Sequence, residues 1–277
     1  MTPIKPDFHS HSTLSDGKLT PTQLLQRAQT QQVTMLALTD HDTTAGLEEA
    51  QQAATQCGIQ LINGVEISTL WQNKAFHIVA LNIDPKNPQL MAGLAKLQAI
   101  RQHRAEKIAL KLQKKGISGA LESVTIASNG GMITRPHFAN FLMQQGYVDT
   151  MQQAFDKYLG QGKSAFVKTQ WIELEQAIQW IQAAGGVSVV AHPLRYKLTA
   201  SWFKRFLSAF KDYGGTGIEV ITARQSLQET QLIAKYAQQY ELLGSMGSDF
   251  HTPNNPWIEL GRIPSLPNDI QAIWTSF

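Results

Sequence analysis

Residues 33–68, VTMLALTDHDTTAGLEEAQQAATQCGIQLINGVEIS, consist of two short apolar runs on either side of an amphipathic segment. The runs over 33–40 and 58–68 are typical of strands, and the apolar spacing over 43–58 is typical of a helix. Strands that are almost continuously apolar and joined through a helix indicate a parallel sheet that helices cover on both faces. This stretch therefore predicts an α/β fold.

The same alternation extends along the chain in both directions. An amphipathic pattern predicts a helix over 20–31, and an apolar run predicts a strand over 75–84. The last third of the chain repeats the order, with expected helices at 171–184, 199–213 and 225–240 and expected strands at 185–192, 215–222 and 242–249. Chains of about 250 residues with this alternation commonly form one α/β barrel.

The alternation breaks between residues 85 and 164. Leucine and isoleucine recur there at helical spacing over 87–115, which predicts one long helix that ends at Gly116. Further helical patterns occupy about 136–145 and 150–160. We therefore expect a barrel made from residues 1–84 and 165–277, interrupted by a small helical insertion domain at 85–164.

The expected insertion is basic. It contains 11 Lys and Arg against 4 Asp and Glu, a net charge of +7, so the rest of a chain with a total charge of +3 carries −4. A patch of this sign favours anionic partners such as phosphates or nucleic acid. For any single lysine, a solvated helix face explains the charge equally well.

Composition restricts the class of protein further. The chain has 277 residues and 43% hydrophobic content, enough for a full-sized core. No apolar stretch is as long as a membrane span, and the N-terminus has no basic-then-apolar signal pattern. The single cysteine, Cys57, excludes an internal disulfide and a cysteine metal cluster, and it suits a reducing compartment. We expect a cytoplasmic protein with no membrane association and no obligate protein partner.

Residues that bind metals are concentrated at the expected strand ends. Six of the eight histidines lie at or just past the carboxyl ends of predicted strands, where the loops of an α/β barrel build its active site. Carboxylates accompany them in the segments SDG, TDHD, GVEIS and GSDFH. The residues that we expect to bind metal are His9, His11, Asp16, His41, Glu66, His77, His192, Asp249 and His251.

The spacing of these residues supports a shared site. Side chains alternate along a strand, so His9 and His11 point the same way, and Asp249 and His251 repeat this step of two residues. Glu66 belongs to an apolar strand, where it is explained either by a structural salt bridge or by two cations that share its carboxylate. Nine imidazole and carboxylate ligands exceed the needs of one ion, so we expect two or three ions. The donor set suits Mn²⁺, Fe²⁺ or Zn²⁺ and does not choose among them.

Four cationic residues and one histidine are candidates for binding an anionic substrate. Arg135 and His137 flank Pro136 at the start of an expected helix, where free backbone amides favour an anion. We expect Arg135 to grip a phosphate and His137 to donate a hydrogen bond or a proton, which makes them the candidate catalytic pair. Lys163, Lys168 and Arg195 are further candidates for substrate binding, and a solvated or salt-bridged position explains each of them equally well.

The motifs DFHSHSTLSDGKLTP, ALTDHDT, NGVEIS, HIVAL, VVAHP and GSDFH together resemble the PHP (polymerase and histidinol phosphatase) domain. The resemblance runs from end to end of the chain. It implies a distorted (β/α)₇ barrel with a trinuclear metal site, and it implies the same nine ligands. The segments ITRPHFANFL (133–142), FDKYLGQGKSAFVKTQW (155–171) and AHPLRY (191–196) resemble members of this family that act as 3′,5′-nucleoside bisphosphate phosphatases and 5′-to-3′ exoribonucleases.

We therefore expect metal-assisted phosphoester hydrolysis, with a metal-activated water in place of a side-chain nucleophile, on nucleotide bisphosphates or short 5′-phosphorylated RNA. Three alternatives stay open. A metal-dependent amidohydrolase also begins with a His-x-His pair, but an amide substrate requires no cationic patch. A histidinol-phosphate phosphatase has the same metal site. A non-catalytic nucleic-acid-binding module predicts gaps in the ligand set, and this sequence has none.

Overall fold

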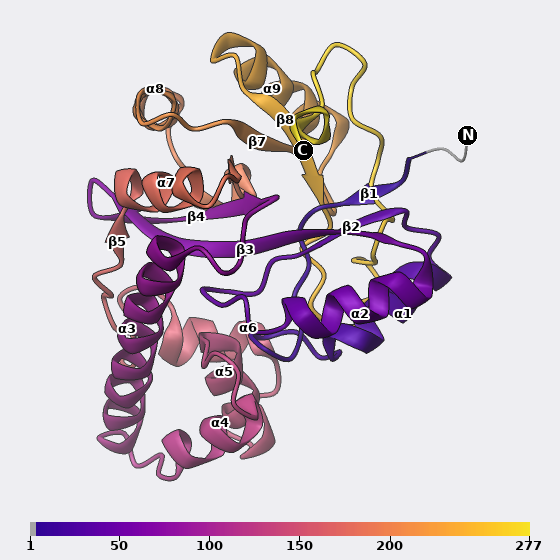
Figure 1. Ribbon diagram of the computed structural model, residues 1–277. Coiled ribbons are helices and arrows are strands. Elements are labelled where there is room, and N and C mark those ends of the chain that lie inside the picture. The colour runs from indigo at the N-terminus through magenta and orange to yellow at the C-terminus, as the bar shows by residue number, and fades with distance from the viewer. Residues whose placement is uncertain (1–3) are drawn as a thin grey trace.

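The computed structural model describes residues 4–277, and its centre is one sheet of eight strands (Figure 1). Seven strands follow one another around the sheet in the order β1-β2-β3-β4-β6-β7-β8, and β5 pairs with β3 beside this path. The strands are β1 (Pro6–Asp7), β2 (Met35–Leu38), β3 (Gln60–Trp71), β4 (Lys74–Leu81), β5 (Ile172–Glu173), β6 (Val187–Val190), β7 (Gly217–Thr222) and β8 (Leu243–Gly247).

The two ends of this path approach each other and nearly close the sheet into a barrel. The amide of Phe8 donates to the carbonyl of Met246 at 2.9 Å, and the amide of Asp249 donates to the carbonyl of His9 at 2.8 Å. Ser10 and Phe250 form an isolated parallel bridge just beyond β1 and β8. The expected distorted (β/α)₇ barrel is therefore confirmed.

The expected all-parallel pairing is wrong at one strand. β4 pairs antiparallel with β3 on one side and with β6 on the other, whereas the remaining pairs of the sheet are parallel. The physical reason is the connection, because only Gln72 and Asn73 separate β3 from β4 and both have positive φ angles, 47° and 62°. A two-residue turn of this kind joins antiparallel strands, while a parallel crossover needs a dozen or more residues.

Helices cover the outside of the barrel: α1 (Pro21–Thr30), α2 (Leu47–Cys57), α7 (Leu174–Ala183), α8 (Ala200–Asp212) and α9 (Leu227–Gln239). Their ends follow local sequence. Thr20 caps α1 in a reciprocal pair with Gln23, Ser226 caps α9 with Glu229, and Gly58 ends α2 with a φ of 68°. Short 3₁₀ turns, η2 (Pro193–Tyr196) and η3 (Ile273–Ser276), complete this part of the chain.

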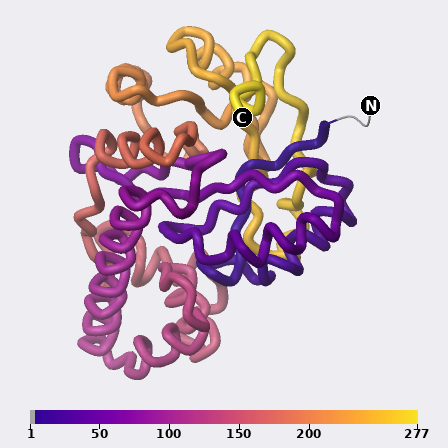
Figure 2. Tube along the Cα trace, in the orientation of Figure 1, coloured from indigo at the N-terminus to yellow at the C-terminus, as the bar shows by residue number. Residues whose placement is uncertain are grey.

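A group of helices between β4 and β5 extends away from the barrel and returns to it (Figure 2). It comprises α3 (Pro88–Gln113), α4 (Ala120–Ser128), α5 (Arg135–Gln144), α6 (Met151–Ala154) and the π-helix η1 (Phe155–Leu159). The first half of α3 packs into the barrel core with Leu90, Leu94 and Leu97, while its second half belongs to a separate apolar cluster with α4 and α5. No helix was expected at the position of α4, and the domain division at 85–164 stays a prediction.

No helix among residues 4–277 is long and apolar enough to cross a membrane.

Candidate metal centre

The nine expected ligands converge at one mouth of the barrel. His9 and His11 follow β1, His41 follows β2, His192 follows β6, and Asp249 and His251 follow β8. Asp16 lies in the loop between β1 and α1. Atoms from these residues form four overlapping groups whose members lie within 4.8 Å of one another: His11, Asp16, His41 and His251; His9, Glu66 and His192; His9, His11 and Asp249; and His41, Glu66 and His77.

Two of the nine residues do not lie at a strand end as expected. Glu66 is in the middle of β3, and His77 is in the middle of β4. They reach the mouth of the barrel because the β3–β4 hairpin continues past the candidate metal centre. β4 is antiparallel to its neighbours, so it begins on the side of the sheet where the parallel strands end. The hairpin beyond Glu66 thereby becomes a wall of the site.

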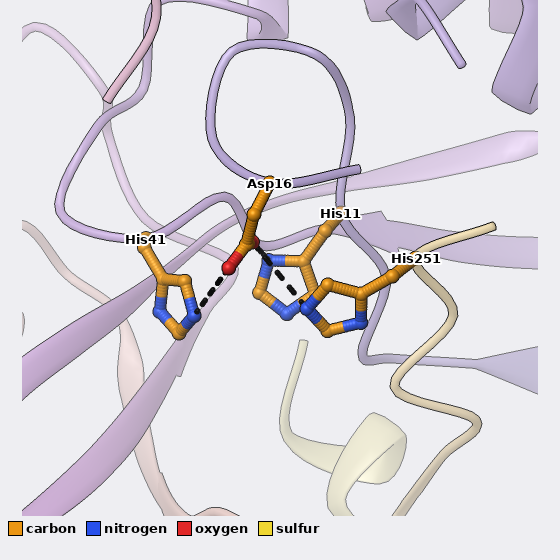
Figure 3. A group of neighbouring side chains, drawn as sticks. All are labelled: His11, Asp16, His41 and His251. Carbon is orange, nitrogen blue, oxygen red and sulfur yellow. Dashed lines mark ion pairs between the residues drawn. The ribbon is translucent and has the colours of Figure 1, made fainter. Parts of the chain in front are cut away.

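Asp16 is the carboxylate of the four-residue group (Figure 3). Its Oδ1 lies 3.3 Å from Nε2 of His251, and its Oδ2 lies 3.7 Å from Nε2 of His41. The rings of His11 and His251 stack with centroids 4.1 Å apart. Burial raises the pKa of Asp16, but the neighbouring His41 and His251 outweigh it and hold the pKa well below its ordinary value. The carboxylate is therefore ionised and ready to bind a cation.

Glu66 uses both carboxylate oxygens. Its Oε1 lies 2.9 Å from Nδ1 of His77 and 3.0 Å from Nε2 of His192, and its Oε2 lies 2.8 Å from Nδ1 of His41. The side chain is only 1% exposed. Burial raises its pKa, yet the surrounding histidines keep that pKa well below the ordinary value. This arrangement fits a carboxylate that two cations share.

Several buried donor and acceptor atoms of this centre lack a hydrogen-bond partner among residues 4–277. Such atoms cost free energy unless a ligand satisfies them. They are nitrogen and oxygen atoms with no thiolate among them, a donor set that suits Mn²⁺, Fe²⁺ or Zn²⁺. The residues present therefore fit divalent cations. The atoms are Nε2 of His9, Nε2 of His11, Oδ1 of Asp16, Nδ1 of His41, Oε2 of Glu66 and Nδ1 of His192.

A second layer of carboxylates holds these residues in place. Glu219 of β7, which the sequence analysis missed, accepts from Nδ1 of His9 at 2.6 Å and from the backbone amide of His192. Asp40 accepts from the amide and hydroxyl of Ser12 and from the hydroxyl of Ser15, at 2.8, 2.5 and 2.6 Å. Asp40 thereby fixes the loop that carries Asp16, and it does not cap the following helix, whose N-cap residue is Gly46.

Three residues of this region have a left-handed backbone that side chains other than glycine rarely adopt. The φ angles are 54° at Asp42, 31° at His192 and 55° at Asp249. Strain of this kind costs of order 1–3 kcal/mol per residue and is retained where the surrounding structure enforces it, often at functional sites. At Asp42 the enforcing contacts come from the amide of Ser68 at 2.7 Å and Nε of Arg101 at 2.6 Å.

The metal centre opens into a cavity of about 300 Å³ that adjoins a second one of about 540 Å³. Arg104, Arg135 and Arg195 line both cavities, and Trp171 forms part of both walls. Arg195 also donates to the Oδ2 of Asp249. The buried Arg101 also lines the first cavity, and neither Arg101 nor Arg104 was among the residues expected to bind substrate.

Of the other three residues expected to bind substrate, only Lys168 lines a cavity. Lys168 lines the second cavity, whereas Lys163 is exposed and lines neither of the two cavities. His137 is buried at the third position of α5, where its Nδ1 accepts from the amide of Thr134 at 3.1 Å. Burial lowers the pKa of this histidine. The residue thus completes the cap of α5 and does not line either cavity.

Comparison with known proteins agrees with this geometry. A 5′-3′ exoribonuclease of Haemophilus influenzae is 46% identical over 273 residues, covering 99% of this chain and 99% of that protein. A 3′,5′-nucleoside bisphosphate phosphatase of Chromobacterium violaceum is 42% identical over 269 residues, covering 97% of this chain and 94% of that protein. A solved structure from the same organism, described as an amidohydrolase with bound sulfate and no metal, has a TM-score of 0.93 at 41% identity and covers 98% of this chain and 95% of its own.

The model of one protein family, described as the PHP domain, matches residues 7–190, which is more than half of the chain. This match and the full-length relatives confirm the resemblance that the motifs indicate. The chain belongs to the PHP domain family.

Proposed function

We propose that this chain is a metal-dependent phosphoesterase that hydrolyses the 3′-phosphate of 3′,5′-nucleoside bisphosphates and removes nucleotides from the 5′ ends of short 5′-phosphorylated RNA. The names of the two full-length relatives support these substrates. The observation that carries the proposal is the junction of a cation-binding cluster with a cavity lined by arginines, an arrangement suited to a phosphate ester.

The arginines at the cavity are poorly neutralised by the protein. Arg195 contacts Asp249 and Arg101 contacts Asp42, but Arg104 and Arg135 form no ion pair with any described residue. Burial and the nearby Arg101 lower the pKa of Arg135, and burial lowers that of Arg104. Since an unpaired cation is costly in such surroundings, an anionic ligand is the natural partner for these two side chains.

The proposed ligands lie around both oxygens of Glu66. His9, His11 and Asp249 would hold one ion, and Asp16, His41 and His251 would hold a second. His77 and His192 lie beside Glu66 and would complete the set. When bound, the ions supply Lewis acidity and lower the pKa of a coordinated water.

The chain's own residues orient the substrate. Arg135 is the first residue of α5 and lines both cavities, so its guanidinium can donate to a phosphate bound there. Its guanidinium lies over the ring of Phe155, 5.6 Å from the centroid, which fixes its direction. Lys168 and Arg195 would hold the substrate in the larger cavity. The roles of Lys163 in substrate binding and of His137 as a proton donor stay predictions.

Three further expectations stay predictions as well. Mn²⁺ is the proposed metal among those that the donor set suits. The cytoplasmic location rests on the single cysteine and the reducing compartment that it suits. The division into a barrel and an insertion domain at 85–164 is supported by the separate apolar cluster of α3, α4 and α5.

Product analysis tests the substrate assignment. The purified protein with Mn²⁺ is incubated in parallel with a 5′-phosphorylated oligoribonucleotide, with 3′-phosphoadenosine 5′-phosphate and with histidinol phosphate. We expect stepwise release of mononucleotides from the 5′ end of the RNA and of phosphate from the bisphosphate. Turnover of histidinol phosphate equal to or better than that of the bisphosphate would overturn the assignment.

A control variant separates the metal site from contaminating nucleases. His11→Ala removes a buried candidate ligand, whereas His103→Ala removes a histidine that is 66% exposed on α3. We expect the first variant to lose hydrolysis and the second to retain it.

A second assay tests the amidohydrolase alternative by incubating the same protein with a panel of N-acyl amino acids. Hydrolysis of these amides without hydrolysis of phosphate esters would overturn the proposal.

A further inference from the structure

A row of cationic side chains runs along α3 and into the turn that follows it, and we call it the α3 stripe: Arg104, Lys107 and Lys111 of the helix and Lys115 of the turn. At 100° per residue the three helical positions fall within an arc of about 60°, so they share one side of the helix. Lys107, Lys111 and Lys115 are exposed, whereas Arg104 is half-buried. The single acid in this part of the helix, Glu106, lies on a different side and pairs with His103.

One end of the α3 stripe lies in the proposed active site. Arg104 lines both cavities, and its Nε atom is buried without a hydrogen-bond partner among residues 4–277. Its guanidinium lies 5.3 Å from the ring centroid of Trp171, on which Arg101 also packs. The stripe therefore starts at the wall that the two cavities share.

The middle of the α3 stripe touches the rim of the larger cavity. Nζ of Lys111 donates to the carbonyl of Phe166 at 2.5 Å, and Phe166 and Lys168 both line that cavity. The bond between Lys111 and Phe166 therefore connects the exposed side of α3 to the rim of the larger cavity. Figure 1 shows α3 extending from the sheet to the far end of the molecule beside α4.

The lysines of the stripe lack acidic partners. None of Lys107, Lys111 and Lys115 forms an ion pair within the part of the chain that the structure describes. From Arg104 to Lys111 the helix rises about 10 Å, a length that covers about three phosphates of a single strand, and Lys115 follows in the next turn. A polyanion with regularly spaced charges is the ligand that such a row fits best.

We infer that the α3 stripe binds the phosphates of the RNA that continues beyond the nucleotide being removed. The inference rests on the proposed function and extends it, because it assigns a surface to the polynucleotide that a mononucleotide bisphosphate does not reach. RNA and bisphosphate then share the metal centre and the arginines of the cavities. Only RNA uses Lys107, Lys111 and Lys115.

The test compares Lys107→Gln/Lys115→Gln with the wild type. Neither lysine side chain makes a hydrogen bond or an ion pair in the described structure. Glutamine is as good a helix former as lysine at position 107, and position 115 lies in an exposed turn, so the fold should be preserved. The matched control is Lys204→Gln/Lys235→Gln, which removes two exposed charges from α8 and α9. Each protein is assayed with Mn²⁺ on a 5′-phosphorylated octaribonucleotide and on 3′-phosphoadenosine 5′-phosphate.

We expect kcat/KM for the octaribonucleotide to fall about 10-fold in the α3 variant and to stay unchanged for the bisphosphate. The control variant should match the wild type on both. The log–log slope of RNA binding against salt, measured on the metal-free protein with a 2′-O-methyl octamer, should decrease in magnitude by about 1.4 for the two lost contacts. Equal activity of the α3 variant and the wild type on RNA, or an equal loss on both substrates, would overturn the inference.

Failure of the proposed function gives a different pattern, because the wild type then hydrolyses neither substrate. The RNA-binding measurement still tests the role of the α3 stripe in that case. A salt slope in the α3 variant equal to that of the wild type would refute the role of the stripe in RNA binding. A membrane surface is the other polyanion to consider. Binding of the wild type to phosphatidylserine vesicles that the α3 variant loses, together with unchanged RNA binding, would assign the stripe to lipid and overturn the inference.

Discussion

Glu219 accepts a hydrogen bond from Nδ1 of His9 at 2.6 Å, and both side chains are 1% exposed or less. This contact fixes the tautomer of His9 with its proton on Nδ1, so that Nε2 faces the other candidate ligands with a free lone pair. The second oxygen of Glu219 accepts from the amide of His192, which has a left-handed backbone. One carboxylate therefore positions two candidate ligands from strands that are far apart in sequence.

Glu219→Gln should weaken metal binding by about 10- to 100-fold, because the amide keeps the shape but loses the charge that supports the imidazole. Metal affinity is measured by titration of the metal-free protein with Mn²⁺. The control is Glu175→Gln, an exposed glutamate of α7. An affinity for Mn²⁺ equal to that of the control would show that Glu219 does not support the centre.

Glu219 also shows what the sequence could and could not predict. The nine candidate ligands were found because histidines and acids at strand ends form an unusual pattern. Glu219 lies inside the apolar strand GIEVIT, the same signal that drew attention to Glu66, but no neighbouring motif marked it. Arg104 shares the basic charge of residues 85–164, but nothing in the sequence singles it out, since only the packing of α3 against Trp171 places it in the cavity wall.

The hairpin of β3 and β4 could have been predicted in full. Only six residues separate the two apolar runs at 58–68 and 75–84, and a connection between parallel strands needs a dozen or more. The expected strands at 58–68 and 75–84 stop short of the turn on both sides. The true strands continue to Trp71 and from Lys74, since their outer residues pack on each other and on β5.

Asp42→Asn should destabilise the protein by about 3 kcal/mol, because it leaves the buried Arg101 without a carboxylate partner. Asparagine tolerates the positive φ angle at this position, so the loss reports the ion pair and not the backbone. The free energy of unfolding is measured in urea. The exposed Asp212→Asn on α8 serves as the control.

A double variant makes this prediction sharper. Asp42→Asn/Arg101→Met removes the unpaired charge together with its partner, so it should recover a large part of the stability that the single change loses. A double variant as unstable as the sum of the two single variants would show that the pair has no coupling.

Addition of Mn²⁺ should raise the melting temperature of the chelator-treated protein. Ions that bind only the folded state at 100 times their Kd stabilise it by about 2.7 kcal/mol, which for a chain of this size corresponds to roughly 5–10 °C. The measurement is a thermal scan with and without EDTA. His11→Ala should lose most of this shift, whereas His103→Ala should keep it, and a wild type that none of Mn²⁺, Fe²⁺ and Zn²⁺ stabilises would contradict the metal centre.

Gly247→Ala should weaken metal binding although residue 247 offers no ligand. Gly247 ends β8 where the barrel closes against β1, and a Cβ atom there would lie 2.3 Å from Cβ of His9 and 2.9 Å from its backbone nitrogen. The strands must separate to admit the methyl group, at a cost of about 1–3 kcal/mol, and His9 moves with them. Gly46→Ala is the control, because its Cβ would meet only side-chain atoms, at 3.0 Å or more. Urea unfolding and Mn²⁺ titration should show a loss in both stability and affinity for Gly247→Ala, and a loss of stability with unchanged affinity would mean that His9 does not depend on the closure of the barrel.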